Sequence, residues 1–374
     1  MRVMVWVVSA LVAAQVNAGG AARPRARDLG LSPGTLETGA LNAITDVAGV
    51  LAGHTTLIEG ERSRTGVTAI LPHGGNLFRE KVPGAVFIGN AFGKLAGSTQ
   101  VDELGTIESP IVLTNTLSVG TALDALVRWT ISRPGNETVR SVNGLVGETN
   151  DGTLNDIRGL HVTQEHVASA IDTAKPGAVP EGAVGAGTGT IAFGWKGGIG
   201  TSSRRVPAQG DTWTVGVLVQ TNYGGRLTVA GVPVWRELIP RPSSDGEAPA
   251  DGSCMIVVAT DAPLDARDLK RLAARAVYAL ARTGSTYSNG SGDFAIAFST
   301  HPSLRVTAAT GPQPRSIVPT DGVSGLFEAV MDATEEAVYN SLLKAVDVTA
   351  HGRTVSALPI APLRDLMRKY ARQP

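Results

Sequence analysis

The sequence predicts one layered domain of strands and helices, of the α/β or α+β class. Two observations carry this prediction. Short apolar segments recur along the 374 residues with glycines between them, and three other segments show helical periodicity. Several of the apolar segments are continuous rather than alternating, which indicates strands that are covered on both faces. The 45 glycines show no repeat period, so we expect many tight turns and close backbone approaches.

The predicted strands are residues 67–72, 85–93, 111–116, 214–222, 255–260 and 294–300. The predicted helices cover residues 118–132, a segment that starts at Leu264, and residues 325–346. In the second helix Leu269, Leu272, Leu280 and their apolar neighbours lie on one face. Pro263 before that helix and Gly284 after it are typical of helix boundaries.

Composition and charge exclude several classes of partner. Charged residues make up 18% and hydrophobic residues 43% of the chain, as in a globular protein with a substantial core. Lys plus Arg and Asp plus Glu both number 33, so the net charge is zero. Because no basic surplus exists to neutralise phosphates, we expect no nucleic-acid partner.

The first 18 residues, MRVMVWVVSALVAAQVNA, are typical of a signal peptide. An early arginine precedes an apolar run, and Val16-Asn17-Ala18 fits a small-x-Ala cleavage site. The alternatives are a membrane anchor or a buried helix, but the apolar run is shorter than the roughly 20 residues that span a bilayer. We therefore expect a periplasmic or secreted protein that is not membrane-bound after signal removal.

The sequence indicates no metal or organic cofactor. Cys254 is the single cysteine, which excludes an internal disulfide and a cysteine-based zinc site. His161 and His166 are five positions apart rather than the four of HExxH, and no G-x-S-x-G motif is evident. The glycine-rich segment 182–204 lacks a nucleotide-binding pattern and is expected to be a closely packed loop, with the lining of a substrate cleft as an alternative.

Ser253 lies where a Pro-rich linker, residues 239–252, meets an apolar strand. Cleavage between Gly252 and Ser253 would give Ser253 a free α-amine, whose pKa of roughly 7.7–8.0 suits a base near neutral pH. The Ser253 hydroxyl could itself attack the Gly252 carbonyl, and glycine tolerates the backbone geometry that this attack requires. An ordinary loop–strand junction is the competing interpretation of the same residues.

Six ordered blocks resolve this choice: LNAITDVAGVLAGH, GETNDGTLNDIRG, GWKGGIGTSSR, GVLVQTNYGG, DGSCMIVVATDAPL and SNGSGDFAIAFST. Together they resemble the family of L-aminopeptidase/D-esterases and β-peptidyl aminopeptidases, from about Leu41 to about Leu343. The resemblance implies a self-processing N-terminal-nucleophile-type hydrolase. It also implies a four-layer αββα sandwich, one domain made of a larger chain 19–252 and a smaller chain 253–374.

The same resemblance implies roles for individual residues. Ser253 would be the nucleophile, with Ser291 and Asp293 relaying or holding charge near it. Asn222 would donate to the oxyanion, and Glu148 would pair with the free amine of the substrate.

Two positions depart from the family pattern. Asp293 stands where some members carry glutamate, which has a longer reach. Thr153 stands where relatives can carry a tyrosine that helps the oxyanion, and threonine is too short to replace it directly.

The resemblance therefore implies a serine aminopeptidase that removes N-terminal residues from short peptides, amides or esters, without a cofactor. Relatives assemble as homo-oligomers, and the same is expected here. The sequence does not rank L-α, D-configured or β-amino substrates. One alternative is an acyltransferase of the ornithine acetyltransferase type, which typically uses threonine as its nucleophile. The other is a non-catalytic periplasmic binding protein.

Overall fold

The computed structural model describes residues 23–208, 210–240, 252–308 and 310–371. The predicted signal peptide, residues 1–18, lies outside the described residues, and so does nearly all of the predicted linker, residues 241–251. Within the described ranges, no helix has both the length and the apolar character needed to cross a membrane.

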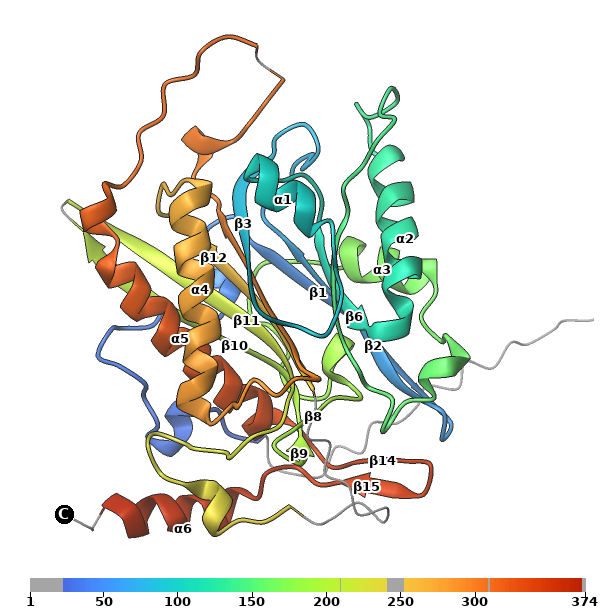
Figure 1. The fold of residues 1–374 in the computed structure, drawn as a ribbon, viewed down its shortest axis with the longest axis vertical. Helices are drawn as coiled ribbons and strands as arrows, with labels where there is room; N and C mark the ends of the chain where they lie inside the picture. Colours follow the sequence, from blue (N-terminus) through green and yellow to red (C-terminus); the bar gives the residue numbers. More distant parts are fainter. Residues whose placement is uncertain (1–22, 209, 241–251, 309, 372–374) are drawn as a thin grey trace, which may run out of the picture.

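Two sheets, each with a pair of helices on one face, form the body of the protein (Figure 1). The first sheet has five strands, in the order β1 (Leu51–Glu59), β2 (Ser63–Leu71), β6 (Ile111–Asn115), β7 (Leu145–Thr149) and β4 (Leu95–Ala96). β6 and β7 are parallel, and the other pairs are antiparallel. Helices α2 (Val119–Ile131) and α3 (Gln164–Asp172) pack on this sheet through a cluster that includes Val67, Leu126 and Val167.

The second sheet has six strands and carries the segment that begins with Ser253. Its order is β10 (Gly198–Ala208), β11 (Asp211–Asn222), β12 (Ser253–Thr260), β13 (Gly292–Ser299), β3 (Val82–Ala91) and β5 (Thr106–Ile107). β12 and β13 are parallel, and the other pairs are antiparallel. Helices α4 (Ala266–Thr283) and α5 (Ser324–Lys344) cover one face of this sheet. Gly284 caps α4 with a left-handed backbone, as the sequence predicts.

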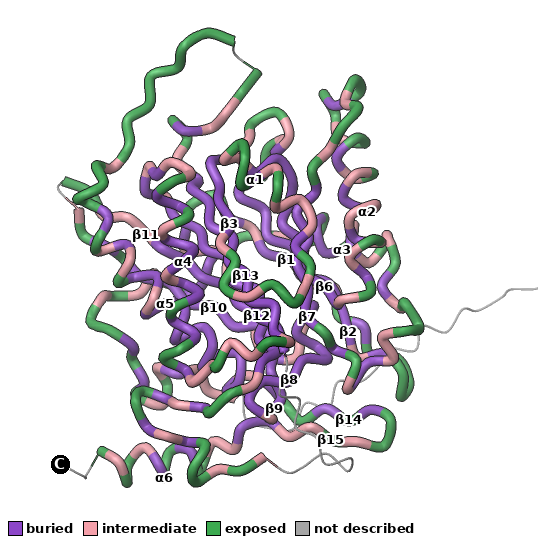
Figure 2. The backbone as a smooth tube through the Cα atoms, viewed as in Figure 1, coloured by how far each residue is buried: buried purple, intermediate pink, exposed green. Residues whose placement is uncertain are grey.

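A third apolar cluster fills the space between the two sheets. It joins Ile70, Leu113 and Leu145 of the first sheet to Leu218, Met255, Val257 and Ile296 of the second. All eight residues of β12 are buried because this cluster covers one face and the α4–α5 layer covers the other. Figure 2 shows the buried strands running through the middle of the molecule. The continuous apolar pattern of residues 255–260 therefore reflects burial on both faces.

The predicted strands and helices are all present, with boundaries shifted by a few residues. The structure adds β1, β7, β10, α3 and α6 (Ile360–Ala371). It also adds the shorter elements β4, β5, α1 (Ser98–Leu104), β8 (Ile191–Ala192), β9 (Trp195–Lys196), β14 (Val348–Ala350) and β15 (Arg353–Val355).

The expectation of a loop over residues 182–204 is wrong for the short strands β8 and β9 and for the last third of the segment, which is the start of β10. Glycine is required there because a Cβ at Gly200 would lie 1.9 Å from the carbonyl oxygen of Ala337 in α5.

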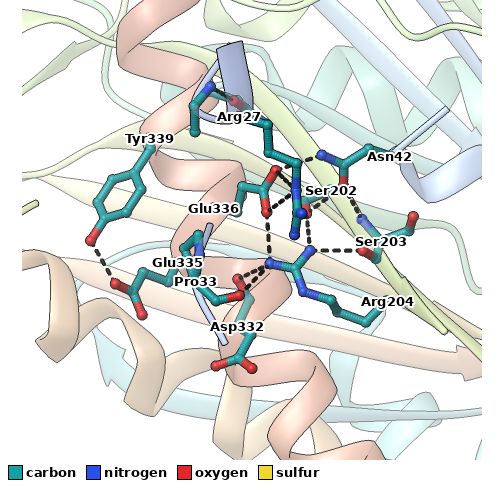
Figure 3. A network of polar contacts seen from close by, with 12 residues as sticks. Arg27, Pro33, Asn42, Ser202, Ser203, Arg204, Asp332, Glu335, Glu336 and Tyr339 are labelled. Atoms are coloured by element: carbon teal, nitrogen blue, oxygen red, sulfur yellow. Dashed lines mark hydrogen bonds and ion pairs between the residues drawn. The ribbon is translucent and has the colours of Figure 1, made fainter. Parts of the chain in front are cut away.

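A buried ion pair joins β10 to α5 (Figure 3). The Arg204 guanidinium donates to the Glu336 carboxylate at 2.7 Å, and both side chains are fully buried. Glu336 also accepts from Arg27 at 3.1 Å and from the Asn42 amide. Arg204 donates further to the hydroxyl of Ser202. Burial of charge is tolerated only when such partners are present.

Arg204→Met should lower the free energy of unfolding by about 3–5 kcal/mol, because it removes a partner from the buried Glu336 carboxylate. Arg62→Met is the matched control, since it breaks an ion pair with Asp156 in which the Arg62 side chain is 68% exposed. Denaturant titration of both variants checks the prediction. Equal losses of stability in the two variants would contradict it.

Candidate active site

Strand register brings three of the predicted site segments together at Ser253. As the first residue of β12, Ser253 pairs with Asn222 at the end of β11 on one side and with Gly292 at the start of β13 on the other. Its hydroxyl oxygen accepts a hydrogen bond from the Gly292 N–H at 3.2 Å. The side chain is buried but borders a cavity. Its position is therefore fixed from both neighbouring strands.

Gly252, the residue before Ser253, lies directly against β11. A Cβ at this position would be 2.0 Å from the carbonyl oxygen of Asn222. No side chain fits in that space unless the backbone moves. The steric constraint gives a physical reason for glycine at this position, in addition to the conformational freedom that the sequence suggested.

Ser291 and Asp293 form a hydrogen-bonded pair beside Ser253. The Ser291 hydroxyl donates to the Asp293 carboxylate at 2.9 Å, and both side chains are buried. The pairing of β13 with β3 is irregular just after Asp293, a kind of irregularity that re-aims side chains next to sites. Burial raises the pKa of Asp293 to about 6, although the hydrogen bond from Ser291 opposes this.

Both polar atoms of the Asn222 side-chain amide make hydrogen bonds. Its oxygen accepts from the N–H of Ile191 at 2.9 Å, and its nitrogen donates to the carbonyl of Asn150 at 3.0 Å. An amide nitrogen carries two hydrogens, so one donor is left for a ligand. Since Asn222 borders the cavity, that donor can serve an oxygen bound near Ser253.

Glu148 approaches the same cavity from the other sheet, near the end of β7. Its carboxylate accepts from the backbone N–H of Lys94 at 3.0 Å and from the Thr116 hydroxyl. The Lys94 ammonium lies 3.9 Å away. Burial raises the pKa of Glu148, and the Thr116 hydrogen bond opposes that rise. A buried carboxylate at the wall of a cavity is suited to binding a cationic group.

The cavity, of about 240 Å³, lies between the ends of the two sheets. Ser253, Asn222, Glu148 and Thr153 border it, whereas Ser291 and Asp293 are not part of its lining. The sequence did not single out several other lining residues, namely Phe92, Lys94, Thr116, Asn150, Ile191, Phe193 and Tyr223. Sequence signals were available for some of these: Asn150 and Tyr223 belong to the GETNDGTLNDIRG and GVLVQTNYGG blocks, and Ile191 and Phe193 lie in the glycine-rich segment 182–204.

A buried lysine supports the glycine-rich wall of the cavity. Lys196 is fully buried, and its ammonium donates to the carbonyls of Gly187, Thr190 and Gly197 at 2.8–2.9 Å. Burial lowers the pKa of Lys196, and the nearby Asp151 carboxylate opposes this. Gly189 and Gly194 belong to the cavity wall, so part of segment 182–204 lines this cavity.

The described part of the chain contains no group of three or more His, Cys, Asp or Glu residues that could hold a metal ion. Cys254 is fully buried next to Ser253, and burial raises the pKa of its thiol well above the usual value. Such a thiol is unreactive. Cys254 therefore fills space in the core.

The fold and the site together define a hydrolase of the peptidase class. The model of peptidase family S58 matches residues 42–355, and the chain belongs to this family. The resemblance that the six sequence blocks indicated is thereby confirmed.

Curated relatives and solved structures agree with this assignment. The chain is 43% identical to beta-peptidyl aminopeptidase BapA of Sphingosinicella microcystinivorans, over 97% of both chains. It matches a solved beta-aminopeptidase of Burkholderia sp. with 40% identity and a TM-score of 0.85, over 94% of this chain and 100% of that one. It also matches the L-aminopeptidase D-Ala-esterase/amidase of Ochrobactrum anthropi, a variant of the Ntn hydrolase fold, with 39% identity and a TM-score of 0.87, over 94% and 99%.

Proposed function

We propose that the protein is a self-processing serine aminopeptidase that acts through an acyl-enzyme on Ser253. Short peptides, amides or esters with a free N-terminal amine are its substrates, and β-amino residues are included because its relatives are named for them. The observation that carries the proposal is the cavity in which Ser253 and Asn222 of one sheet face Glu148 of the other.

Self-processing would begin in the intact chain. The Ser253 hydroxyl oxygen attacks the carbonyl carbon of Gly252, and the C–N bond to Ser253 breaks as its nitrogen takes up a proton. Water then hydrolyses the resulting ester, which leaves a free carboxylate on Gly252 and a free α-amine on Ser253. The close approach of the Gly252 backbone to β11 supports this step, because it limits the movement of the residue that carries the scissile carbonyl. Chains 19–252 and 253–374 would remain together as a four-layer αββα sandwich.

In the processed enzyme the α-amine of Ser253 would act as the base. It takes the hydroxyl proton while the oxygen attacks the substrate carbonyl, and the negative oxygen that develops accepts a hydrogen bond from the Asn222 amide. Loss of one such donor typically costs about 3–4 kcal/mol of transition-state stabilisation. The protonated amine would be stabilised by the Asp293 carboxylate, whose orientation Ser291 fixes.

Glu148 would make the enzyme an aminopeptidase rather than an endopeptidase. Its buried carboxylate pairs with the substrate ammonium and so sets the distance from the amine to the carbonyl that Ser253 attacks. A peptide whose amine is blocked would leave this carboxylate buried without its cationic partner, and such a peptide is rejected.

We also propose that the protein is exported, since residues 1–18 have the pattern of a signal peptide. Assembly into homo-oligomers is a further proposal, which rests on the family resemblance.

Ser253→Ala should abolish hydrolysis of β-alanyl p-nitroanilide, because no other group supplies the nucleophile. Glu148→Gln should raise KM for the same substrate, and N-acetyl-β-alanyl p-nitroanilide should not be cleaved by the wild-type protein. Steady-state kinetics with matched protein concentrations provide the measurement. A Ser253→Ala variant that retains wild-type kcat/KM would disprove the mechanism.

Acidic pH should suppress activity. Asp293 has a pKa of about 6, so its carboxylate is ionised above that pH and becomes protonated below it. At pH 5 only about one tenth of it is ionised, and kcat/KM should be at least about tenfold lower than at pH 8. Protonation of the Ser253 amine and of Glu148 acts in the same direction. A pH profile of kcat/KM that is flat between 5 and 8 would rule out this assignment of the charged groups.

A further inference from the structure

Lys94 borders the active-site cavity, yet the mechanism above does not use its side chain. It lies between β3 and β4, and its backbone N–H holds the Glu148 carboxylate at 3.0 Å. Its ammonium is 3.9 Å from the same carboxylate oxygen, and its side chain is 57% exposed. A cation at this place opposes the binding of a substrate ammonium to Glu148. The presence of Lys94 in the cavity wall therefore requires another explanation.

The Lys94 ammonium is free to turn toward a ligand. A separation of 3.9 Å exceeds the 2.7–3.2 Å of a hydrogen bond, so Glu148 does not fix its position. Glu148 is already held by the Thr116 hydroxyl and by the Lys94 backbone. A lysine ammonium has three donors on a flexible stem and can follow a carboxylate over several positions.

The charge of the cavity points to the kind of substrate. Among the side chains of the described residues that line it, those of Glu148 and Lys94 carry formal charges, one negative and one positive, and processing would add a carboxylate on Gly252 and an amine on Ser253. A substrate that brings only an ammonium would leave the Lys94 charge unmatched and would repel it. A first residue with both an ammonium and a carboxylate would pair each charge with an opposite one.

We propose that the cavity recognises an acidic first residue, with its ammonium on Glu148 and its carboxylate on Lys94. This inference rests on the proposed aminopeptidase function and names the substrate class of that same site. An aspartyl residue has this chemistry, and it can be linked to the rest of the substrate through either of its two carboxyl groups. In a β-aspartyl substrate the ammonium and the carboxylate share one carbon, and the side-chain carboxyl is the acyl group that Ser253 attacks. In an α-aspartyl substrate the side chain supplies the carboxylate.

The test measures kcat/KM for four p-nitroanilides, each hydrolysed by the processed wild-type protein that contains both chains. β-Aspartyl is paired with β-alanyl, which lacks only the carboxylate, and α-aspartyl is paired with α-asparaginyl, which has a similar shape without the charge. In the wild-type protein, kcat/KM for at least one acidic substrate should equal or exceed that of its neutral partner. The pair that shows this preference identifies the linkage.

Lys94→Met should lower the ratio of acidic to neutral kcat/KM at least about tenfold, since one ion pair with a desolvated substrate is lost. Lys94→Arg should retain most of the ratio because it keeps the charge. Lys270→Met is the control, because Lys270 pairs with Asp102 outside the cavity lining, and it should leave the ratio unchanged. Thermal melting of all three variants shows whether they fold like the wild-type protein.

Two other outcomes are distinguishable. Hydrolysis of β-alanyl p-nitroanilide with an acidic-to-neutral ratio below one for both pairs would overturn the inference and leave the aminopeptidase proposal intact. A ratio that Lys94→Met does not change would do the same. Failure to hydrolyse any of the four substrates would overturn the proposed function and the inference together.

Discussion

The pairing of β12 between β11 and β13 is the constraint on which the site depends. It places Ser253 in one row with Asn222 and Gly292, so the proposed nucleophile and oxyanion donor are adjacent without being close in sequence. A slip of one residue would turn the Ser253 side chain to the opposite face of the sheet. Burial of all eight residues of β12, by the other sheet on one face and by helices on the other, holds this register.

The packing of the two sheets determines which side chains share the cavity with Ser253. The six-stranded sheet carries Ser253, and the five-stranded sheet carries Glu148, and both side chains border the cavity. In the proposed mechanism, selection of an N-terminal amine is then a consequence of how the two sheets meet rather than of one loop. Lys94 and Lys196 modify that space, the first as a charge at the wall and the second as support behind it.

Much of the fold could be predicted from the sequence because its core strands are continuous apolar runs and its helices are periodic. β7 and the start of β10 were not predicted, because they contain glycine at positions where other elements approach closely. Gly200 in β10, for example, lies against α5. Hydrophobic pattern alone did not identify the site: Ser291, Asp293, Asn222 and Glu148 came from the family resemblance. Lys94 and Thr116 carried no local signal, because their partner Glu148 is distant in sequence. Lys196 lies in the GWKGGIGTSSR block, but its partners are backbone carbonyls whose position only the fold defines.

The proposed mechanism requires that the Gly252–Ser253 bond breaks and exposes Ser253. The most direct measurement is the intact mass of the purified wild-type protein under denaturing conditions, with N-terminal sequencing of the smaller species. We expect two chains, the smaller of which spans residues 253–374 and begins Ser-Cys-Met-Ile. A single uncut chain that hydrolyses aminoacyl p-nitroanilides would contradict the mechanism, because its base would then not exist.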